Sequence, residues 1–168
     1  FNGSIAGSLE LNSNINMNGS LYFNETDHVN ITNFDNINLS NPSSFTLAIS
    51  FDPDDNFNTS GNSNLLGLAT AVDNYFGFNF DSLNRSGIVW TNSSGGGVEL
   101  QPSSGLNFSD GPFILYFVYN DSNGNASLYI DGVLEDSIEL GESTAMDVVS
   151  STMGIGSLAS LSADPTDY

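Results

Sequence analysis

The stretch FILYFVYNDSNGNASLYIDGVLEDS, residues 113–137, decides the fold of this chain. FILYFVY (113–119) is apolar at both alternating sets of positions, so we expect a central strand that is covered on both faces. NDSNGN (120–125) consists of residues that tolerate left-handed or Asx-turn geometry and therefore predicts a loop. Asp131-Gly132 favours a tight turn between SLYI and the next strand, VLEDSI. Together these signals predict antiparallel strands joined by short turns.

Alternating apolar and polar residues recur along the rest of the chain, separated by turn residues at the spacing of a sandwich. In FTLAISF (45–51) the odd positions are large and apolar, which indicates one buried face. No window shows the apolar repeat of a helix, so the predicted fold class is all-β. The other predicted strands are SLYF (20–23), HVNI (28–31), NYFGFNF (74–80), SGIVW (86–90), GVEL (97–100), ASLYIDG (126–132) and DSIEL (136–140).

Length and charge restrict the partners of the chain. Its 168 residues, 39% of them apolar, suit one domain with one core. Twenty acidic residues oppose a single Arg85 and no lysine, which gives a net charge of −19. Such a charge repels phosphates and anionic lipid, so we expect neither nucleic-acid binding nor membrane insertion. There is no cysteine, no long apolar run and no signal-peptide pattern.

Asparagine sequons point to a secreted glycoprotein. Asn-x-Ser/Thr is the acceptor for N-linked glycans and marks surface positions of secreted proteins. The chain has about twice as many as random placement of its residues would produce, and we expect an extracellular, N-glycosylated protein. The alternative is that a turn-rich chain full of Asn and Ser generates sequons by accident. The predicted sites are Asn2, Asn18, Asn24, Asn30, Asn38, Asn58, Asn84, Asn92, Asn107, Asn120 and Asn125.

The order of these motifs resembles that of the laminin-G-like or concanavalin-A-like jelly roll. GSLYFNETDHVNI (19–31) is similar to the opening strands of that family, and SSFTLAISF (43–51) is similar to its Phe-Thr-hydrophobic strand, with Phe51 where a tryptophan is usual. Residues 113–137 resemble its hairpin ending in Leu-Tyr-Ile-Asp-Gly, and MGIGS (153–157) resembles the strand that follows. The resemblance implies an antiparallel jelly-roll sandwich.

The closing strand of that family is missing from the C-terminal end. Members finish with a Phe-x-Gly-x-Ile-Asp-x-hydrophobic-x-hydrophobic strand, and FNGSIAGSLEL (1–11) is similar to it, with Ala6 in place of the Asp. The resemblance therefore implies that this strand is displaced to the N-terminus. We expect residues 1–18 to form an extended arm and residues 19–168 the jelly-roll domain. The apolar side chains of the arm are Phe1, Ile5, Leu9, Leu11, Ile15 and Met17.

Two arrangements of this arm are open. It can insert into the next subunit, because incomplete sheets recruit strands, and repetition would build a head-to-tail filament from copies of this chain. It can instead fold back on its own domain, which would make the chain a circularly permuted, monomeric carbohydrate-binding or adhesion module. The sequence pattern favours the extracellular filament, because alternation continues past residue 11 to Met17.

Other candidate sites are weaker. Jelly rolls of this family often bind carbohydrate or protein at one rim, commonly with calcium, and the candidate calcium ligands here are Asp52, Asp54 and Asp55, with Asp121 and Asn123 in a second loop. Acidic turn residues are more often simply solvated. Trp90, Tyr75, Tyr116 and Tyr119 are candidates for stacking on sugars, although aromatic residues within strands usually belong to the core. His28 is the only histidine and the paired-carboxylate motif of related glycosidases is absent, so we expect no enzymatic activity.

Overall fold

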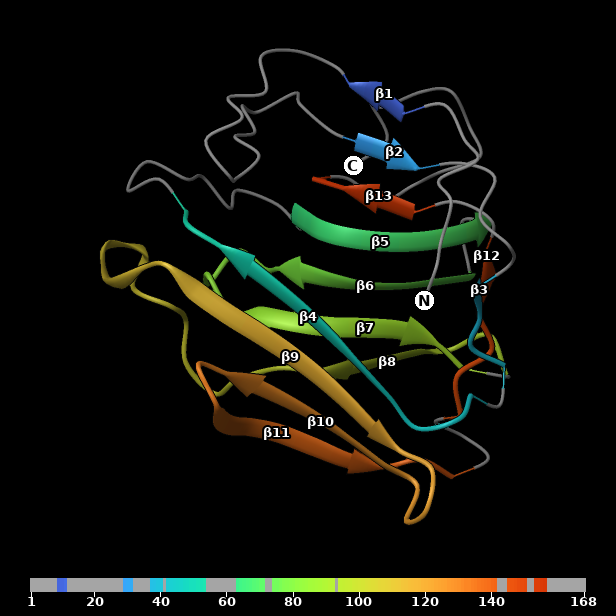
Figure 1. Ribbon diagram of the computed structural model, residues 1–168. Helices are drawn as coiled ribbons and strands as arrows, with labels where there is room; N and C mark the ends of the chain where they lie inside the picture. Colours follow the sequence, from blue (N-terminus) through green and yellow to red (C-terminus); the bar gives the residue numbers. More distant parts are fainter. Residues whose placement is uncertain are drawn as a thin grey trace.

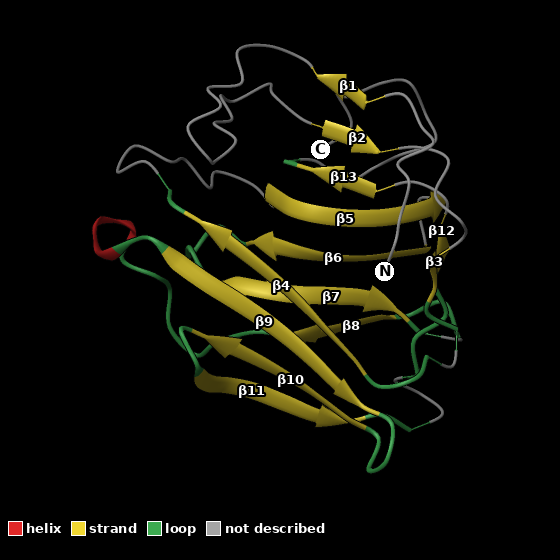
Figure 2. Cartoon of the chain, in the orientation of Figure 1, coloured by secondary structure: helices red, strands yellow, loops and turns green. Residues whose placement is uncertain are grey.

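The computed structural model is an antiparallel β-sandwich (Figure 1). It describes residues 9–11, 29–31, 37–40, 42–53, 63–71, 74–92, 94–141, 145–150 and 153–156. Nearly all of the regular structure in these residues is strand (Figure 2). The single described helix is the short 3₁₀ turn η1 (Phe108–Asp110), so no described helix is long enough to cross a bilayer. The predicted all-β class is confirmed.

The larger layer is a seven-stranded sheet. In spatial order its strands are β1 (Leu9–Leu11), β2 (Val29–Ile31), β13 (Met153–Ile155), β5 (Ser63–Ala71), β6 (Asn74–Phe80), β7 (Ser86–Thr91) and β8 (Gly97–Leu100). The smaller layer has four strands in the order β11 (Val133–Glu139), β10 (Asn125–Ile130), β9 (Phe113–Asn120) and β4 (Phe45–Phe51). A short pair, β3 (Ile37–Asn38) with β12 (Val149–Ser150), lies at one end.

Aromatic side chains fill the space between the two layers. The Phe117 ring of the four-stranded sheet lies 5.5 Å from that of Phe76 and 5.9 Å from that of Trp90, both of the seven-stranded sheet. Burial of large apolar area of this kind is the main stabilising contribution to a sandwich. The largest side chains of the core that are fully buried are Phe76, Phe78, Phe80, Ile88, Trp90, Leu100, Leu115, Phe117, Leu128 and Val148.

Strand β9 is central in its sheet, but it is not covered on both faces as the sequence predicted. Burial alternates along it, with Phe113, Leu115 and Phe117 buried and Ile114 exposed. The seven-stranded sheet packs on one side of the four-stranded sheet only, so the second set of apolar residues on β9 faces outward. The expectation of a doubly covered strand is therefore wrong.

The sequence pattern does not predict strand β5. It pairs with β13 and β6 and so lies inside the larger sheet. Its register with β6 shifts between Asn64 and Leu66 and again between Ala69 and Ala71. Such irregularities break the strict alternation by which a strand is recognised.

The turn at Asp131-Gly132 matches its prediction. Asp131 has φ of 50° and Gly132 has φ of 83°, the pair of positive values that a two-residue hairpin turn requires. The carboxylate of Asp131 also accepts a hydrogen bond of 2.7 Å from the backbone N–H of Ile114. The turn therefore links the start of β9 to the β10–β11 hairpin.

The N-terminal arm is described only at Leu9–Leu11. These residues form β1, the edge strand of the seven-stranded sheet, and pair antiparallel with β2 of the same chain. This is the arrangement of the fold-back alternative. Phe1, Ile5, Ile15 and Met17 lie outside the described residues, and insertion of the arm into a neighbouring subunit stays a prediction.

Gly77 on β6 faces Gly67 of β5, and the two backbones approach closely there. A Cβ at position 77 would lie 2.5 Å from the backbone oxygen of Leu66 and 3.1 Å from the Cα of Gly67. We expect Gly77→Ala to lower the free energy of unfolding by about 1–2 kcal/mol, because the strands must separate to admit the methyl group. Urea unfolding measures this, with Gly141→Ala as control since no atom lies within 4 Å of the Cβ there. Equal stability of the two variants would contradict the prediction.

Candidate binding surface

The outward side of the four-stranded sheet carries an aromatic and apolar surface. Tyr116 of β9 is directly opposite Tyr129 of β10, and Leu134 of β11 is opposite Tyr129 on its other side. Both tyrosines are partly exposed, while their neighbours Phe117 and Leu128 are fully buried. We call this surface the tyrosine face and define it as Ile114, Tyr116, Val118, Tyr129 and Leu134.

The neighbouring positions on this side of the sheet carry small and hydroxyl-bearing side chains. Ala48 of β4 is opposite Tyr116, and Ser50 is opposite Ile114. Val118 lies between Thr46 and Ser127. Small side chains cover little of the tyrosine rings beside them, and hydroxyls can both donate and accept hydrogen bonds. The arrangement offers flat apolar area beside polar groups.

Two of the large apolar residues here are well exposed. Leu134 is 53% exposed and Ile114 is 38% exposed. Single exposed apolar residues are ordinary on protein surfaces, but a contiguous group on one face is typical of an interaction site.

The predicted stacking residues separate into two groups. Trp90 is fully buried, and Tyr119 is buried on the inner side of β9, so both belong to the core. Burial and the neighbouring carboxylate of Asp121 raise the pKa of Tyr119, which keeps its hydroxyl protonated. Tyr75 is partly exposed but lies on the other sheet. Only Tyr116 of the predicted group contributes to the tyrosine face.

Tyr129 and Leu134 were not predicted as binding residues. Both lie in stretches that the sequence assigned to strands, and alternation alone does not say which side of a strand faces the second sheet. The feature that marks Tyr129 as a binding residue is the register of β10 with β9, because it places Tyr129 beside Tyr116. That pairing is a property of the hairpin rather than of either strand.

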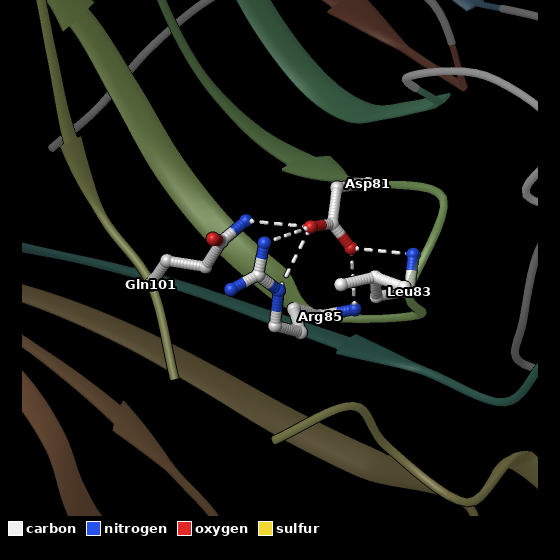
Figure 3. A network of polar contacts seen from close by, with 4 residues as sticks. All are labelled: Asp81, Leu83, Arg85 and Gln101. Carbon is white, nitrogen blue, oxygen red and sulfur yellow. Dashed lines mark hydrogen bonds and ion pairs between the residues drawn. The ribbon is translucent and has the colours of Figure 1, made fainter. Parts of the chain in front are cut away.

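The only arginine of the chain, which has no lysine, is engaged elsewhere, in the turn between β6 and β7 (Figure 3). The guanidinium of Arg85 donates to Asp81 Oδ2 from Nε at 2.8 Å and from Nη2 at 2.5 Å. The side-chain amide of Gln101 donates to the same oxygen at 3.2 Å, and the backbone N–H groups of Leu83 and Arg85 donate to Oδ1 at 2.9 and 3.0 Å. The bond from Gln101, the residue after β8, links this turn to the end of that strand.

Asp81 titrates below the ordinary range of an aspartate. Burial alone would raise the pKa of its carboxyl, but hydrogen bonds from the Arg85 side chain and from the backbone of Arg85 and Leu83 outweigh burial and lower that pKa. The ion pair therefore remains charged through the neutral and mildly acidic range.

Of the predicted calcium ligands, Asp52, Asp121 and Asn123 lie within the described residues. Asp52 is exposed, and Asp54 and Asp55 lie outside the described residues. In the second loop, Asp121 accepts from the Tyr119 hydroxyl, and Asn123 accepts from the backbone of Asn125. Within the described part of the chain no three acidic or histidine side chains converge as metal ligands do. Calcium binding stays a prediction.

The described sequons differ in accessibility. Asn107, Asn120 and Asn125 are exposed in loops or at a strand end. Asn84 and Asn92 are partly buried in turns, and the side chain of Asn92 accepts hydrogen bonds from the backbone of Ser94 and Gly96. Asn30 and Asn38 lie within strands β2 and β3. Asn2, Asn18, Asn24 and Asn58 lie outside the described residues, and glycosylation at every sequon stays a prediction.

Comparison with known proteins identifies the fold. No known family model matches the chain, and no curated protein matches it in sequence. Its backbone is similar to the binding domain of botulinum neurotoxin DC in complex with rat synaptotagmin II, with a TM-score of 0.65 and 16% identity over 90% of this chain and 39% of that one. It is similar to botulinum neurotoxin type C, which depends on interaction with two ganglioside molecules to enter cells (TM-score 0.64, 14% identity, 94% and 40% covered).

A third similar structure is the pair of domains LG4-5 of the mouse laminin α1 chain. Its TM-score is 0.51, with 15% identity over 74% of this chain and 31% of that one. The chain spans about two fifths or less of the length of these solved structures. The chain therefore has the laminin-G-like, concanavalin-A-like jelly-roll fold that the sequence motifs predicted, and identities of this size extend no further than the fold.

Proposed function

We propose that this chain is a carbohydrate-binding or adhesion module that holds its ligand on the tyrosine face. The observation that carries the proposal is the cross-strand pair Tyr116 and Tyr129, partly exposed on the outer side of the sheet. Tyrosine offers rigid contact area with a polar end, at low cost in side-chain entropy. The apolar side of a sugar ring can pack on such rings while its hydroxyls bond to the serines and threonine beside them.

The solved structures support this class of function. Botulinum neurotoxin type C interacts with gangliosides, and another botulinum binding domain was solved in complex with SialylT. Because this chain matches only about two fifths of those chains, their ligand sites are not carried over to it residue by residue. The intramolecular pairing of β1 fits a self-contained module, so we propose the binding module in preference to a filament.

An extracellular location is part of this proposal. It is supported by the exposed sequons at Asn107, Asn120 and Asn125. A secreted glycoprotein would meet glycans on surfaces outside the cell, which is where an adhesion module acts.

Truncating either tyrosine should weaken glycan binding. We expect Tyr116→Ala and Tyr129→Ala each to reduce affinity for an immobilised glycan about tenfold, which corresponds to about 1.4 kcal/mol of lost contact. Tyr116→Phe should retain most of the affinity, because it keeps the ring. Binding to a glycan array followed by titration of the glycans that bind measures this.

The matched control is Leu83→Ala. Leu83 is 63% exposed and lies in the β6–β7 turn of the seven-stranded sheet, outside the tyrosine face, so its truncation should leave affinity unchanged. Absence of any bound glycan across the array, or affinity that survives both tyrosine truncations, would overturn the proposed function.

A further inference from the structure

No arginine or lysine lies on the tyrosine face. The chain contains one arginine and no lysine. Arg85 belongs to the seven-stranded sheet, where its guanidinium donates twice to Asp81, and the tyrosine face is on the outer side of the other sheet. Recognition of carboxylate, sulfate or phosphate groups by proteins commonly uses Arg or Lys. That recognition element is absent here.

Carboxylates border the same face. Asp131 is exposed in the turn between β10 and β11, where its side chain bonds to the backbone N–H of Ile114. Glu139 is exposed at the other end of β11. Both add to the field of a chain with a net charge of −19. Like charges across an interface disfavour a partner, and their effect at an exposed surface weakens as salt is added.

From these observations we infer that the tyrosine face selects uncharged glycans and discriminates against glycans that carry carboxylate or sulfate groups. This inference rests on the proposed function and adds to it the chemical class of the ligand. Selection comes from two sources. The paired tyrosines and the neighbouring hydroxyls bind a neutral sugar, and the carboxylates of Asp131 and Glu139 repel an anionic one.

Matched pairs of ligands test this inference. Each neutral oligosaccharide that binds in the array is compared with the same oligosaccharide bearing one sialic acid or one sulfate, by calorimetry in EDTA. At low salt we expect the charged member to bind at least about tenfold more weakly. Raising the ionic strength to about 1 M shortens the screening length to about 3 Å. The difference in affinity between the neutral and the charged glycan should then become smaller.

Neutralising the two carboxylates beside the tyrosine face tests whether they repel charged glycans. Asp131→Asn keeps an oxygen that can accept from the Ile114 N–H, and asparagine tolerates the positive φ of this turn. The double variant Asp131→Asn with Glu139→Gln should bind neutral glycans as before and reduce the penalty for charged ones by about threefold or more.

The outcomes separate this inference from the proposed function. If no glycan of either kind binds, the proposed function is wrong. If only charged glycans bind, the proposed function stands and the inference of neutral selectivity is wrong. If charged members bind as tightly as their neutral partners, with affinity that still depends on Tyr116 and Tyr129, the proposed function stands and the inference of neutral selectivity is wrong. The titrations are then repeated with calcium in place of EDTA. Binding that requires calcium and favours the charged members would overturn the inference equally, because a bridging cation would then supply the missing positive charge.

Discussion

Phe117→Ala is expected to lower the free energy of unfolding by about 4 kcal/mol, within the range for deleting a fully buried aromatic ring. Phe117 is completely buried and its ring lies within 6 Å of those of Phe45, Phe76 and Trp90, which come from both sheets. Removing it leaves a cavity where the layers meet, and β-sheet backbones cannot collapse fully to fill it. Since domains of this size are stable by about 5–15 kcal/mol, the loss would be a large fraction of the total.

Unfolding in urea, followed by the fluorescence of Trp90, measures this loss, because Trp90 is the only tryptophan and is fully buried. The control is Tyr116→Ala, the adjacent residue on the other side of β9. It should cost less than about 1.5 kcal/mol of stability, because a partly exposed ring leaves no internal cavity. The two substitutions therefore affect different properties: Phe117→Ala lowers stability, and Tyr116→Ala lowers the affinity for glycan. Similar losses of stability in both variants would contradict the assignment of inner and outer faces.

Asp81→Ala is expected to cost about 3 kcal/mol, because it removes carboxylate hydrogen bonds to two backbone N–H groups, each worth about 1.5 kcal/mol or more. It also leaves the Arg85 guanidinium without the two bonds that Asp81 Oδ2 accepts from it. The ion pair contributes the smaller part, since Arg85 is 30% exposed and solvent screens it. Urea unfolding at pH 7 measures the loss, and Asp131→Asn, which preserves its turn, is a control expected to change little.

The pH dependence of this difference has a definite sign. Because the folded state lowers the pKa of Asp81, the stabilisation is fully present above the unfolded pKa of about 4 and is lost as the pH falls through the lower folded value. The gap in stability between the unsubstituted chain and Asp81→Ala should therefore be constant from pH 7 to about pH 5 and shrink below about pH 4. A gap that grows on acidification would show that the carboxylate is not the stabilising form.

Where alternation is regular, the sequence pattern predicts the strands well. FTLAISF became β4 and NYFGFNF became β6, each with the predicted bounds, and the Asp131-Gly132 turn formed as expected. These predictions succeeded because a period of two and a turn that needs positive φ are local properties. The failure at β5 has an equally local cause, since two irregularities in its pairing disrupt the alternation between Asn64 and Ala71.

The binding surface depended on information that no single strand contains. Phe117 and Tyr116 are adjacent aromatic residues in an apolar run, and nothing in FILYFVY says which of them enters the core. Tyr129 gains its significance only from the register that sets it opposite Tyr116. The sequence alone also does not show that the Arg85 guanidinium is bonded to Asp81 rather than placed beside the tyrosines.

By itself the sequence determined the all-β class, most of the strands, the jelly-roll resemblance and an acidic surface poor in cations, because each of these depends on composition or on short-range periodicity. Only the tertiary structure decided that one side of β9 remains open, that Leu9–Leu11 pairs within its own chain, and that two tyrosines meet on the outer face. The physical reason is that strands of period two offer two equivalent sides, and the choice between them is made by the packing of one sheet on the other.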